Sequence, residues 1–223
     1  MGIVTGLSAI SKAMEQPSFN SDGPKGRWFK IGDGQSVKIR FLQEIDPDSP
    51  SYSNEAGLGI VAIEHQNPKD YKRKAVCTLE DEGQCYGCEE YRRDPKSGWK
   101  SKPRFYINVL VNDGKEEPYV SIMSQGIGAK SATSEISQYA IETGSISNLN
   151  WKIKRTGTEK DTNYSIIPLP TGDVTPVDLS KYELYDLRTT AVRSVPYAEQ
   201  ENFYKGIVTD ESVESSTSSS IGW

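Results

Sequence analysis

The sequence is poor in the residues that much catalytic and cross-linking chemistry requires, because it has one histidine and three cysteines in 223 residues. A single histidine leaves no pair of imidazoles for nucleophilic work. Three cysteines leave one unpaired, which argues against a disulfide framework. We therefore expect neither a nucleophile-type enzyme nor a disulfide-stapled fold.

Long apolar runs are missing as well, and no signal-peptide pattern is present in the printed sequence. The longest apolar run, 56–63, is far shorter than the roughly 18 residues that a membrane helix needs. The first residues have no signal-peptide pattern. We therefore expect a soluble protein in a reducing, cytoplasmic setting, without a membrane contact.

The charge is unevenly distributed along the chain. The formal net charge is -5, and 199–223 holds five acidic residues against one lysine, so the rest is nearly neutral. The hydrophobic fraction of 35% is low, which indicates that part of the chain is loop or tail. The expected organisation is an N-terminal arm and linker (1–26), a folded core (27–208) and a disordered acidic tail (209–223).

All the soft metal ligands lie in one short stretch: His65, Cys77, Cys85 and Cys88. A tetrahedral Cys3His zinc site needs this set of donors, and the Cys85-Tyr86-Gly87-Cys88 turn resembles a zinc knuckle in which Gly87 allows a tight backbone turn. With four protein ligands and no open position, the expected ion is structural, one Zn2+ per chain.

The histidine and the three cysteines could also have structural or redox roles that need no metal. Free cysteines are often small buried hydrophobic residues, and a lone histidine is often a satisfied polar residue. Cys85 and Cys88 also have the spacing of a thioredoxin-like redox pair, but the flanking sequence lacks the strand and helix that accompany that motif.

Hydrophobic periodicity predicts a protein that is mainly β with some α. Turn residues separate the strands, and Asn112-Asp113-Gly114 predicts a hairpin. One helix is expected between the third strand and the last pair, which is the inventory of an OB-fold, a five- or six-stranded antiparallel barrel. A zinc subdomain at about 64–104 would interrupt this barrel. The expected strands are 37–41, 58–63, 105–111, 119–123, 151–155 and 164–169, and the expected helices are 85–93 and 129–142.

Helices are also expected near both ends of the chain. Residues 1–16 have apolar side chains at helical spacing, either as a free arm or packed on the body. Ser180 is expected to cap a helix at 181–187, and Ser194 one at 197–204. Both C-terminal helices should pack on the barrel.

Several stretches resemble the single-stranded DNA-binding proteins of T-even bacteriophages. They are KGRW (25–28), GQSVKIRFL (34–42), the segment with one histidine and three cysteines, YINVLV (106–111) and WKIKR (151–155). The resemblance spans roughly 25–170. It implies a zinc-containing OB-fold that coats single-stranded DNA without sequence specificity during phage replication, recombination and repair, in the host cytoplasm.

The resemblance also implies roles for both ends. An N-terminal arm would support self-association along the DNA, although Lys12 is the only basic residue in 1–16. The tail would recruit replication proteins such as a polymerase, helicase or primase. Its acids and aromatic end are similar to the tails of bacterial single-strand binders, which selects Asp210, Glu211, Glu214 and Trp223 as partner-binding residues. An unstructured solubility tail is the alternative.

Basic and aromatic residues interleave on both sides of the metal stretch. Single strands are bound by positive charge for the phosphates and by aromatic faces on which bases stack. The expected DNA-binding residues are Lys38, Arg40, Lys69, Tyr71, Lys72, Arg73, Lys74, Tyr91, Arg92, Arg93, Trp99, Lys100, Lys102, Arg104 and Tyr106.

Two rival classes of function remain. A zinc enzyme needs an open ligand position, and a deaminase needs a glutamate soon after the histidine, whereas Glu64 precedes His65. The other rival is a zinc-stapled RNA-binding or protein-interaction module without a role on single-stranded DNA. The sequence alone does not separate DNA from RNA.

Overall fold

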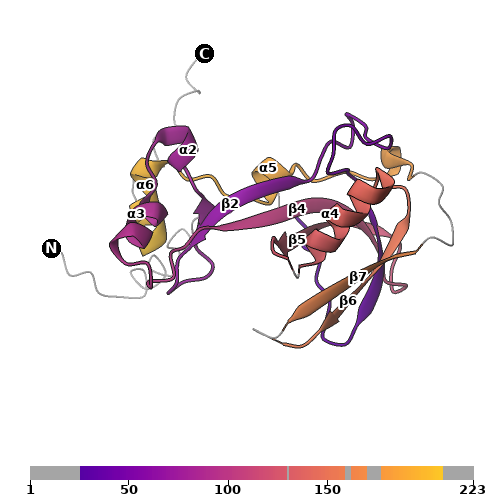
Figure 1. Ribbon diagram of the computed structural model, residues 1–223, viewed down its shortest axis with the longest axis horizontal. Helices are drawn as coiled ribbons and strands as arrows, with labels where there is room; N and C mark the ends of the chain where they lie inside the picture. The colour runs from indigo at the N-terminus through magenta and orange to yellow at the C-terminus, as the bar shows by residue number, and fades with distance from the viewer. Residues whose placement is uncertain (1–25, 130, 159–161, 170–176, 208–223) are drawn as a thin grey trace, which may run out of the picture.

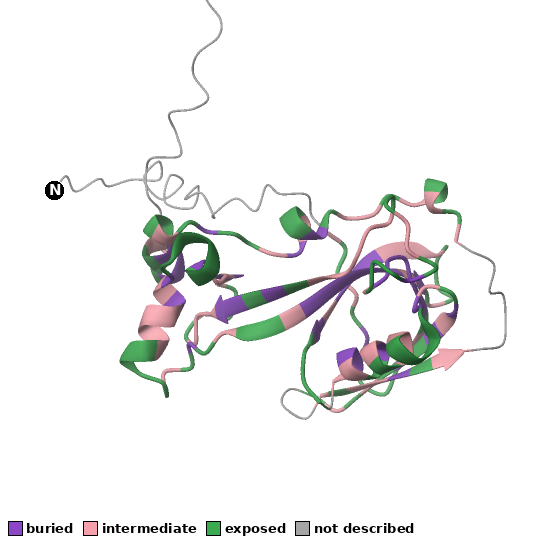
Figure 2. Ribbon diagram, turned by 45° about the horizontal axis from the view of Figure 1, so that its top comes forward, coloured by how far each residue is buried: buried purple, intermediate pink, exposed green. Residues whose placement is uncertain are grey.

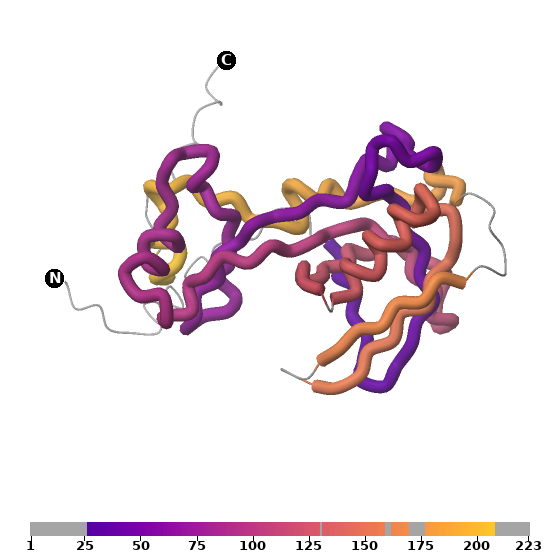
Figure 3. The backbone as a smooth tube through the Cα atoms, in the orientation of Figure 1, coloured from indigo at the N-terminus to yellow at the C-terminus, as the bar shows by residue number. Residues whose placement is uncertain are grey.

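The computed structural model describes residues 26–129, 131–158, 162–169 and 177–207. The expected helix at 1–16 and the partner-binding residues Asp210, Glu211, Glu214 and Trp223 lie outside these ranges. The described chain forms a small lobe and a large lobe, which two long strands connect (Figures 1 and 3). No helix in these ranges is long and apolar enough to span a membrane.

A single antiparallel sheet of seven strands runs through both lobes. All six expected strands are present, with ends shifted by a few residues, and a short strand in the metal stretch joins them. The bounds are β1 (Ser36–Phe41), β2 (Ile60–Gln66), β3 (Lys74–Val76), β4 (Lys102–Asn112), β5 (Tyr119–Gly126), β6 (Asn150–Thr156) and β7 (Asn163–Leu169).

The long strand β4 determines the shape of the sheet. One edge pairs with β2 along its first half, where Glu64 lies opposite Lys102, and with β1 along its second half, where Ile39 lies opposite Val111. The other edge of β4 pairs with β5, and β6 and β7 continue the sheet beyond β1. The large lobe therefore contains β1, β5, β6, β7 and most of β4, while β3 and the ends of β2 and β4 reach the small lobe.

The predicted barrel is not closed. The path β5-β4-β1-β6-β7 leaves β5 and β7 as edge strands that do not pair with each other in the described ranges. Helix α4 (Ala132–Thr143) contacts both strands, and its Glu135 Oε2 accepts a hydrogen bond from the backbone N of Ile166 at 3.3 Å. Because the helix occupies this position, the sheet stays open, and an OB-fold barrel is not confirmed.

The core of the large lobe lies between α4 and one face of the sheet. Alternate residues of β4, from Phe105 to Val111, are at most 4% exposed on this face. Trp151 of β6 is 1% exposed and meets Phe41 and Tyr139 edge-on, with ring centroids 5.4 and 4.8 Å apart. Its indole N donates to the carbonyl of Ile146, so the buried polar atom is satisfied.

The C-terminal segment departs from the predicted helices. The expected helix 181–187 is wrong: the chain forms η2 (Leu179–Lys181) and α5 (Leu187–Thr190) instead, with N-caps Asp178 and Asp186 whose carboxylates accept backbone N–H groups. Helix α6 (Tyr197–Lys205) matches its prediction, but its N-cap is Pro196 rather than Ser194.

These C-terminal elements pack in two different places. Leu187 and Ala191 cover Tyr106 and Ile122 on the outer face of β4 and β5, where the Asn108 amide donates to the carbonyl of Tyr185 at 2.9 Å. Helix α6 packs instead against α3 (Tyr86–Arg93), next to α2 (Leu79–Glu82), so its predicted packing on the barrel is wrong.

Candidate functional site

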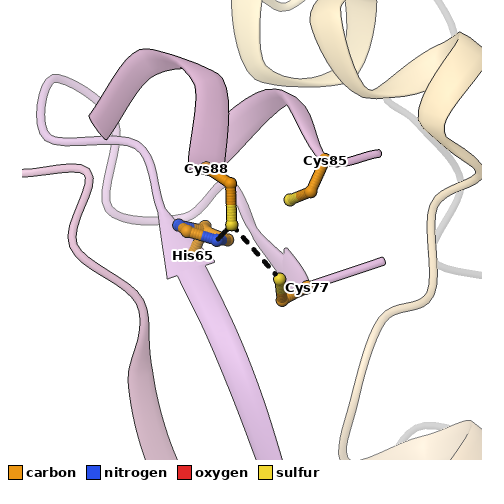
Figure 4. Close-up of side chains that lie close together, drawn as sticks. All are labelled: His65, Cys77, Cys85 and Cys88. Atoms are coloured by element: carbon orange, nitrogen blue, oxygen red, sulfur yellow. Dashed lines mark hydrogen bonds between the residues drawn. The ribbon is translucent and has the colours of Figure 1, made fainter. Parts of the chain in front are cut away.

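The four predicted ligands converge in the small lobe. The donor atoms of His65, Cys77, Cys85 and Cys88 all lie within 4.8 Å of one another (Figure 4). The Cys88 Sγ is 3.3 Å from the His65 Nε2 and 3.5 Å from the Cys77 Sγ. All three cysteines are free thiols. The residues are therefore close enough to bind one metal ion.

Three neighbouring elements position these side chains. His65 lies on β2 opposite Ala75 of β3, and Cys77 follows β3 with its backbone N donating to the carbonyl of Ile63 at 2.8 Å. Cys85 is the N-cap of α3 and Cys88 lies in its first turn. The sheet edge thus supplies two ligands and the helix start supplies two.

Glycine at position 87 is required for a reason other than the predicted turn. Gly87 lies within α3 and is not among the glycines with positive φ. A Cβ added there would lie 2.3 Å from the Cγ of His65. The absent side chain is what allows the helix to approach the imidazole, so the predicted turn at this glycine was wrong.

The imidazole of His65 has a defined orientation. Its Nδ1 lies 2.7 Å from the carbonyl oxygen of Trp99, and a carbonyl only accepts hydrogen bonds. Nδ1 must therefore carry the proton, which leaves the lone pair of Nε2 directed at the sulfur atoms. Metal-binding histidines are oriented in the same way by a second hydrogen bond.

The thiols differ in acidity because their surroundings differ. Burial raises the pKa of Cys88 to about 12, and the two neighbouring thiols add to this effect. For Cys85, burial is outweighed by the neighbouring His65 and by hydrogen bonds from the backbone amides of Cys88 and Thr78, which together lower the pKa to about 6. Three adjacent thiolates repel one another, so a cation between them favours their joint ionisation.

The donor set fits zinc on chemical grounds. A tetrahedral site with zinc–sulfur bonds of about 2.3 Å places its sulfur atoms about 3.8 Å apart. The observed spacing between the Cys77 and Cys88 sulfur atoms is close to this value. Three sulfurs and one imidazole nitrogen also form the donor set of structural zinc sites.

Aromatic residues and one glutamine surround the ligands. Trp99 is 9% exposed and meets Tyr86 and Tyr204 edge-on, with centroids 5.7 and 4.8 Å apart. Gln200 of α6 is fully buried, and its Oε1 accepts the backbone N of Tyr86 at 2.9 Å. Helix α6 therefore holds the segment that carries Cys85 and Cys88.

A hollow of about 210 Å³ opens at the small-lobe end of β2 and β4. Four cationic side chains and one carboxylate line it, together with the exposed ring of Tyr71. In the part of the chain that the structure describes, Lys100 and Lys102 are exposed and form no ion pair. The lining residues are Glu64, Gln66, Pro68, Tyr71, Lys74, Gly98, Lys100, Lys102 and Arg104.

Glu64 connects the charged residues below the hollow. Its Oε2 accepts from the Tyr106 hydroxyl at 2.8 Å and lies 3.0 Å from the Lys74 Nζ and 4.0 Å from the Arg104 Nε. Burial lowers the pKa of Lys74, and the Glu64 carboxylate opposes that shift. The carboxylate thus offsets part of the positive charge and fixes where it lies.

The structure brings five of the predicted DNA-binding residues around this hollow and assigns structural contacts to others. Trp99 and Tyr106 are buried and offer no free ring to a base. The Arg73 guanidinium pairs with Asp70 and donates to the carbonyl of Phe203, which ties the loop after β2 to α6. Arg40 is 7% exposed and donates to the carbonyl of Ser147.

The remaining predicted residues lie outside the hollow's lining. Lys69 and Lys72 are exposed on the loop that carries Tyr71, and Lys38 is exposed on β1. Arg92 is exposed on α3, Arg93 pairs with Glu90, and the half-buried Tyr91 packs near Trp99. Their position outside the hollow was not evident from the sequence, because the interleaved pattern does not reveal which face a side chain occupies.

Sequence reasoning missed three residues of this region. Glu64 was considered only as a potential catalytic base, and Gln200 and Trp28 were not selected. A charged residue directly after the apolar run of β2 was the available signal for Glu64. No local pattern marks Gln200, since its partners lie far away in the chain.

Comparison of the chain with protein-family models, with curated proteins and with solved structures gives no match.

Proposed function

We propose that this protein binds single-stranded DNA without sequence specificity, in a groove that contains this hollow and runs along β4. The observation that carries the proposal is the hollow beside β4, where four cations and an exposed tyrosine meet. Non-specific binding of a single strand requires this combination of phosphate and base contacts. No open ligand position is left among the four candidate ligands, which argues against zinc catalysis.

The four cations of the groove have two different roles. Lys100 and Lys102 have no acidic partner among the described residues, so they are free to neutralise phosphates and release counterions. Lys74 and Arg104 lie beside the Glu64 carboxylate, which fixes their positions. These two cations form the rigid positive side of the groove. Base contacts then depend on stacking, which tolerates any sequence because every base has an aromatic face.

We further propose that the metal is zinc and that the large lobe is an open variant of the OB-fold. The Cys3His donor set supports zinc. Five strands with one helix before the last hairpin support the OB-type arrangement, and Lys102 and Arg104 of β4 line the hollow.

The cellular role that we propose is coating of single strands during phage DNA replication, recombination and repair in the host cytoplasm. The likeness of the stretches 25–28, 34–42 and 106–111 to phage single-strand binders supports it. In this proposal the tail residues Asp210, Glu211, Glu214 and Trp223 recruit replication proteins, and the N-terminal arm contacts neighbouring copies on the strand.

A paired charge-removal experiment tests the groove. The double variant Lys100→Ala, Lys102→Ala removes two lining cations, and the control Lys152→Ala, Lys154→Ala removes two exposed lysines of β6. Affinity for a labelled single-stranded oligonucleotide is measured by anisotropy at several salt concentrations. The slope of log affinity against log salt should fall by about 1.4 for the groove variant, at roughly 0.7 per phosphate contact. It should hardly change for the control.

Equal slopes for both double variants would show that Lys100 and Lys102 do not contact phosphates and that the DNA lies elsewhere. Competition with duplex DNA and with RNA of the same sequence completes the test. Duplex that competes as well as single strand contradicts the function, and RNA that competes better makes the protein an RNA binder.

A further inference from the structure

Burial of Trp99 and Tyr106 leaves the groove without two of its predicted stacking residues. Among the described aromatic residues, the large exposed rings are those of Tyr71 and Trp28, which are 72% and 39% exposed. Tyr71 lies on the small-lobe side of the hollow. Trp28 belongs to the segment that leads into the large lobe.

The backbone around Trp28 is firmly held against β5. Trp28 forms a parallel bridge with Ile122, the N of Phe29 donates to the carbonyl of Ile122 at 2.9 Å, and the N of Ile122 donates to the carbonyl of Arg27 at 2.8 Å. A ring on such a fixed backbone loses little further freedom when it binds a ligand.

The ring of Trp28 lies on the same face of the sheet as the groove. Arg104, Tyr106 and Asn108 alternate on the outer face of β4, and Ile122 lies opposite Asn108. The Trp28 ring meets the Tyr106 ring edge-on at 6.1 Å, and the Lys74 Nζ lies 5.2 Å from the centroid of Tyr106. Tyr106 thus separates Trp28 from the cations of the hollow by the width of a single ring.

We propose that Trp28 is the base-stacking platform at the large-lobe end of the groove, opposite Tyr71 at the small-lobe end. This inference rests on the proposed function and names two residues that perform it. A single strand that crosses Lys102 and Arg104 presents one base to each ring. Paired bases in a duplex cannot turn their faces to these rings, so the two platforms select unpaired nucleic acid.

A matched pair of substitutions tests the platform. Trp28→Phe keeps an aromatic face, and Trp28→Leu keeps an apolar side chain without one. Affinity for a fluorescein-labelled oligo(dT) should fall roughly fivefold to 100-fold for Trp28→Leu and much less for Trp28→Phe, in line with the usual loss per stacked base. Melting temperatures and zinc content of both variants are measured alongside. Equal affinities for the two variants would reduce Trp28 to a packing residue.

A fluorescence experiment provides a readout that packing alone does not change. Trp99 and Trp151 are buried, so in a Trp223→Phe background the described tryptophan that a base can reach is Trp28. Saturating oligo(dT) should quench this protein strongly, and adding Trp28→Phe should abolish most of the quenching while anisotropy still reports binding. Quenching that survives without Trp28 overturns the inference. Wild-type protein that fails to bind any oligonucleotide overturns the proposed function instead.

Discussion

At the scale of single residues, the hydroxyl of Tyr106 joins two opposite charges. It accepts a hydrogen bond from the Lys74 Nζ at 2.6 Å and donates one to the Glu64 Oε2 at 2.8 Å. Burial raises the pKa of Tyr106, and the Glu64 carboxylate adds to the shift, so the phenol keeps the proton that it donates. Tyr106 therefore fixes the positions of Lys74 and Glu64 in the lining of the hollow.

Tyr106→Phe should destabilise the fold while leaving DNA affinity nearly unchanged. The lost hydrogen bonds involve charged groups, so the free energy of unfolding should fall by about 1.5–3 kcal/mol. Urea denaturation measures this loss, and oligonucleotide titration of the folded variant measures affinity. A large loss of affinity in a stable variant would return Tyr106 to the role of a stacking residue.

The residue types and the spacing of His65, Cys77, Cys85 and Cys88 sufficed to predict that these side chains come together, because no other histidine or cysteine competes. The exposure of aromatic residues was not predictable in the same way. Tyr106 lies on the outer face of β4, and the cover that Leu187 and Ala191 provide comes from a distant part of the chain. Trp99 is buried by Tyr204 of α6, which is equally distant.

At the scale of elements, helix α6 acts as a clamp on the metal segment. Besides accepting from Tyr86, Gln200 donates its amide to the Thr78 hydroxyl and to the carbonyl of Val195, both at 3.0 Å. Thr78 follows Cys77 directly, and Tyr86 follows Cys85. One buried side chain thus ties the two halves of the ligand loop to the same helix.

Gln200→Ala should loosen this clamp. Truncation leaves a cavity and unpaired buried polar groups, so we expect a loss of about 2–4 kcal/mol in unfolding free energy. The control is Gln138→Ala on the exposed side of α4, where a change within about 0.5 kcal/mol is expected. A zinc-binding dye should remove the metal from the Gln200→Ala protein at a higher rate than from the control. Equal extraction from both variants would contradict the clamp.

Element prediction succeeded where periodicity was strong and failed where contacts were distant. The alternation of β1, β4 and β6 predicted their strands, whereas the three residues of β3 are too few to show a period. Asp178 and Asp186 compete with Ser180 as helix caps, which displaced the expected helix. The position of α4 across the open edge was not encoded in any local pattern.

At the scale of the whole molecule, the small lobe has a smaller hydrophobic core than the large lobe, built around Trp99 and Tyr204. Its strand β3 has three residues and its helix α2 has four. Most residues of its helices are exposed or intermediate, green and pink in Figure 2. The large lobe has its own core around Trp151. We therefore expect the two lobes to differ in their dependence on metal.

Removal of the metal by a chelator should unfold the small lobe first. Hydrogen exchange should speed up at 64–101 and in α6, while β1 and β6 stay protected. Affinity for single strands should drop as well, because Tyr71, Lys74 and Lys100 belong to the lobe that loosens. Cys77→Ser should reproduce the effect without a chelator. Uniform exchange in both lobes would show that metal is not a local support.

The regular spacing of the β4 side chains has a mechanical consequence for a single strand in the proposed groove. Alternate side chains of a β-strand, such as those of Lys102 and Arg104, repeat at about 6.6 Å. One strand of duplex DNA advances only about 3.4 Å per nucleotide. Phosphates that follow the cations of β4 one by one must be drawn out to nearly twice that pitch. Binding would therefore lengthen the strand. Because tension favours the longer state, the protein should bind stretched single-stranded DNA more tightly than relaxed DNA.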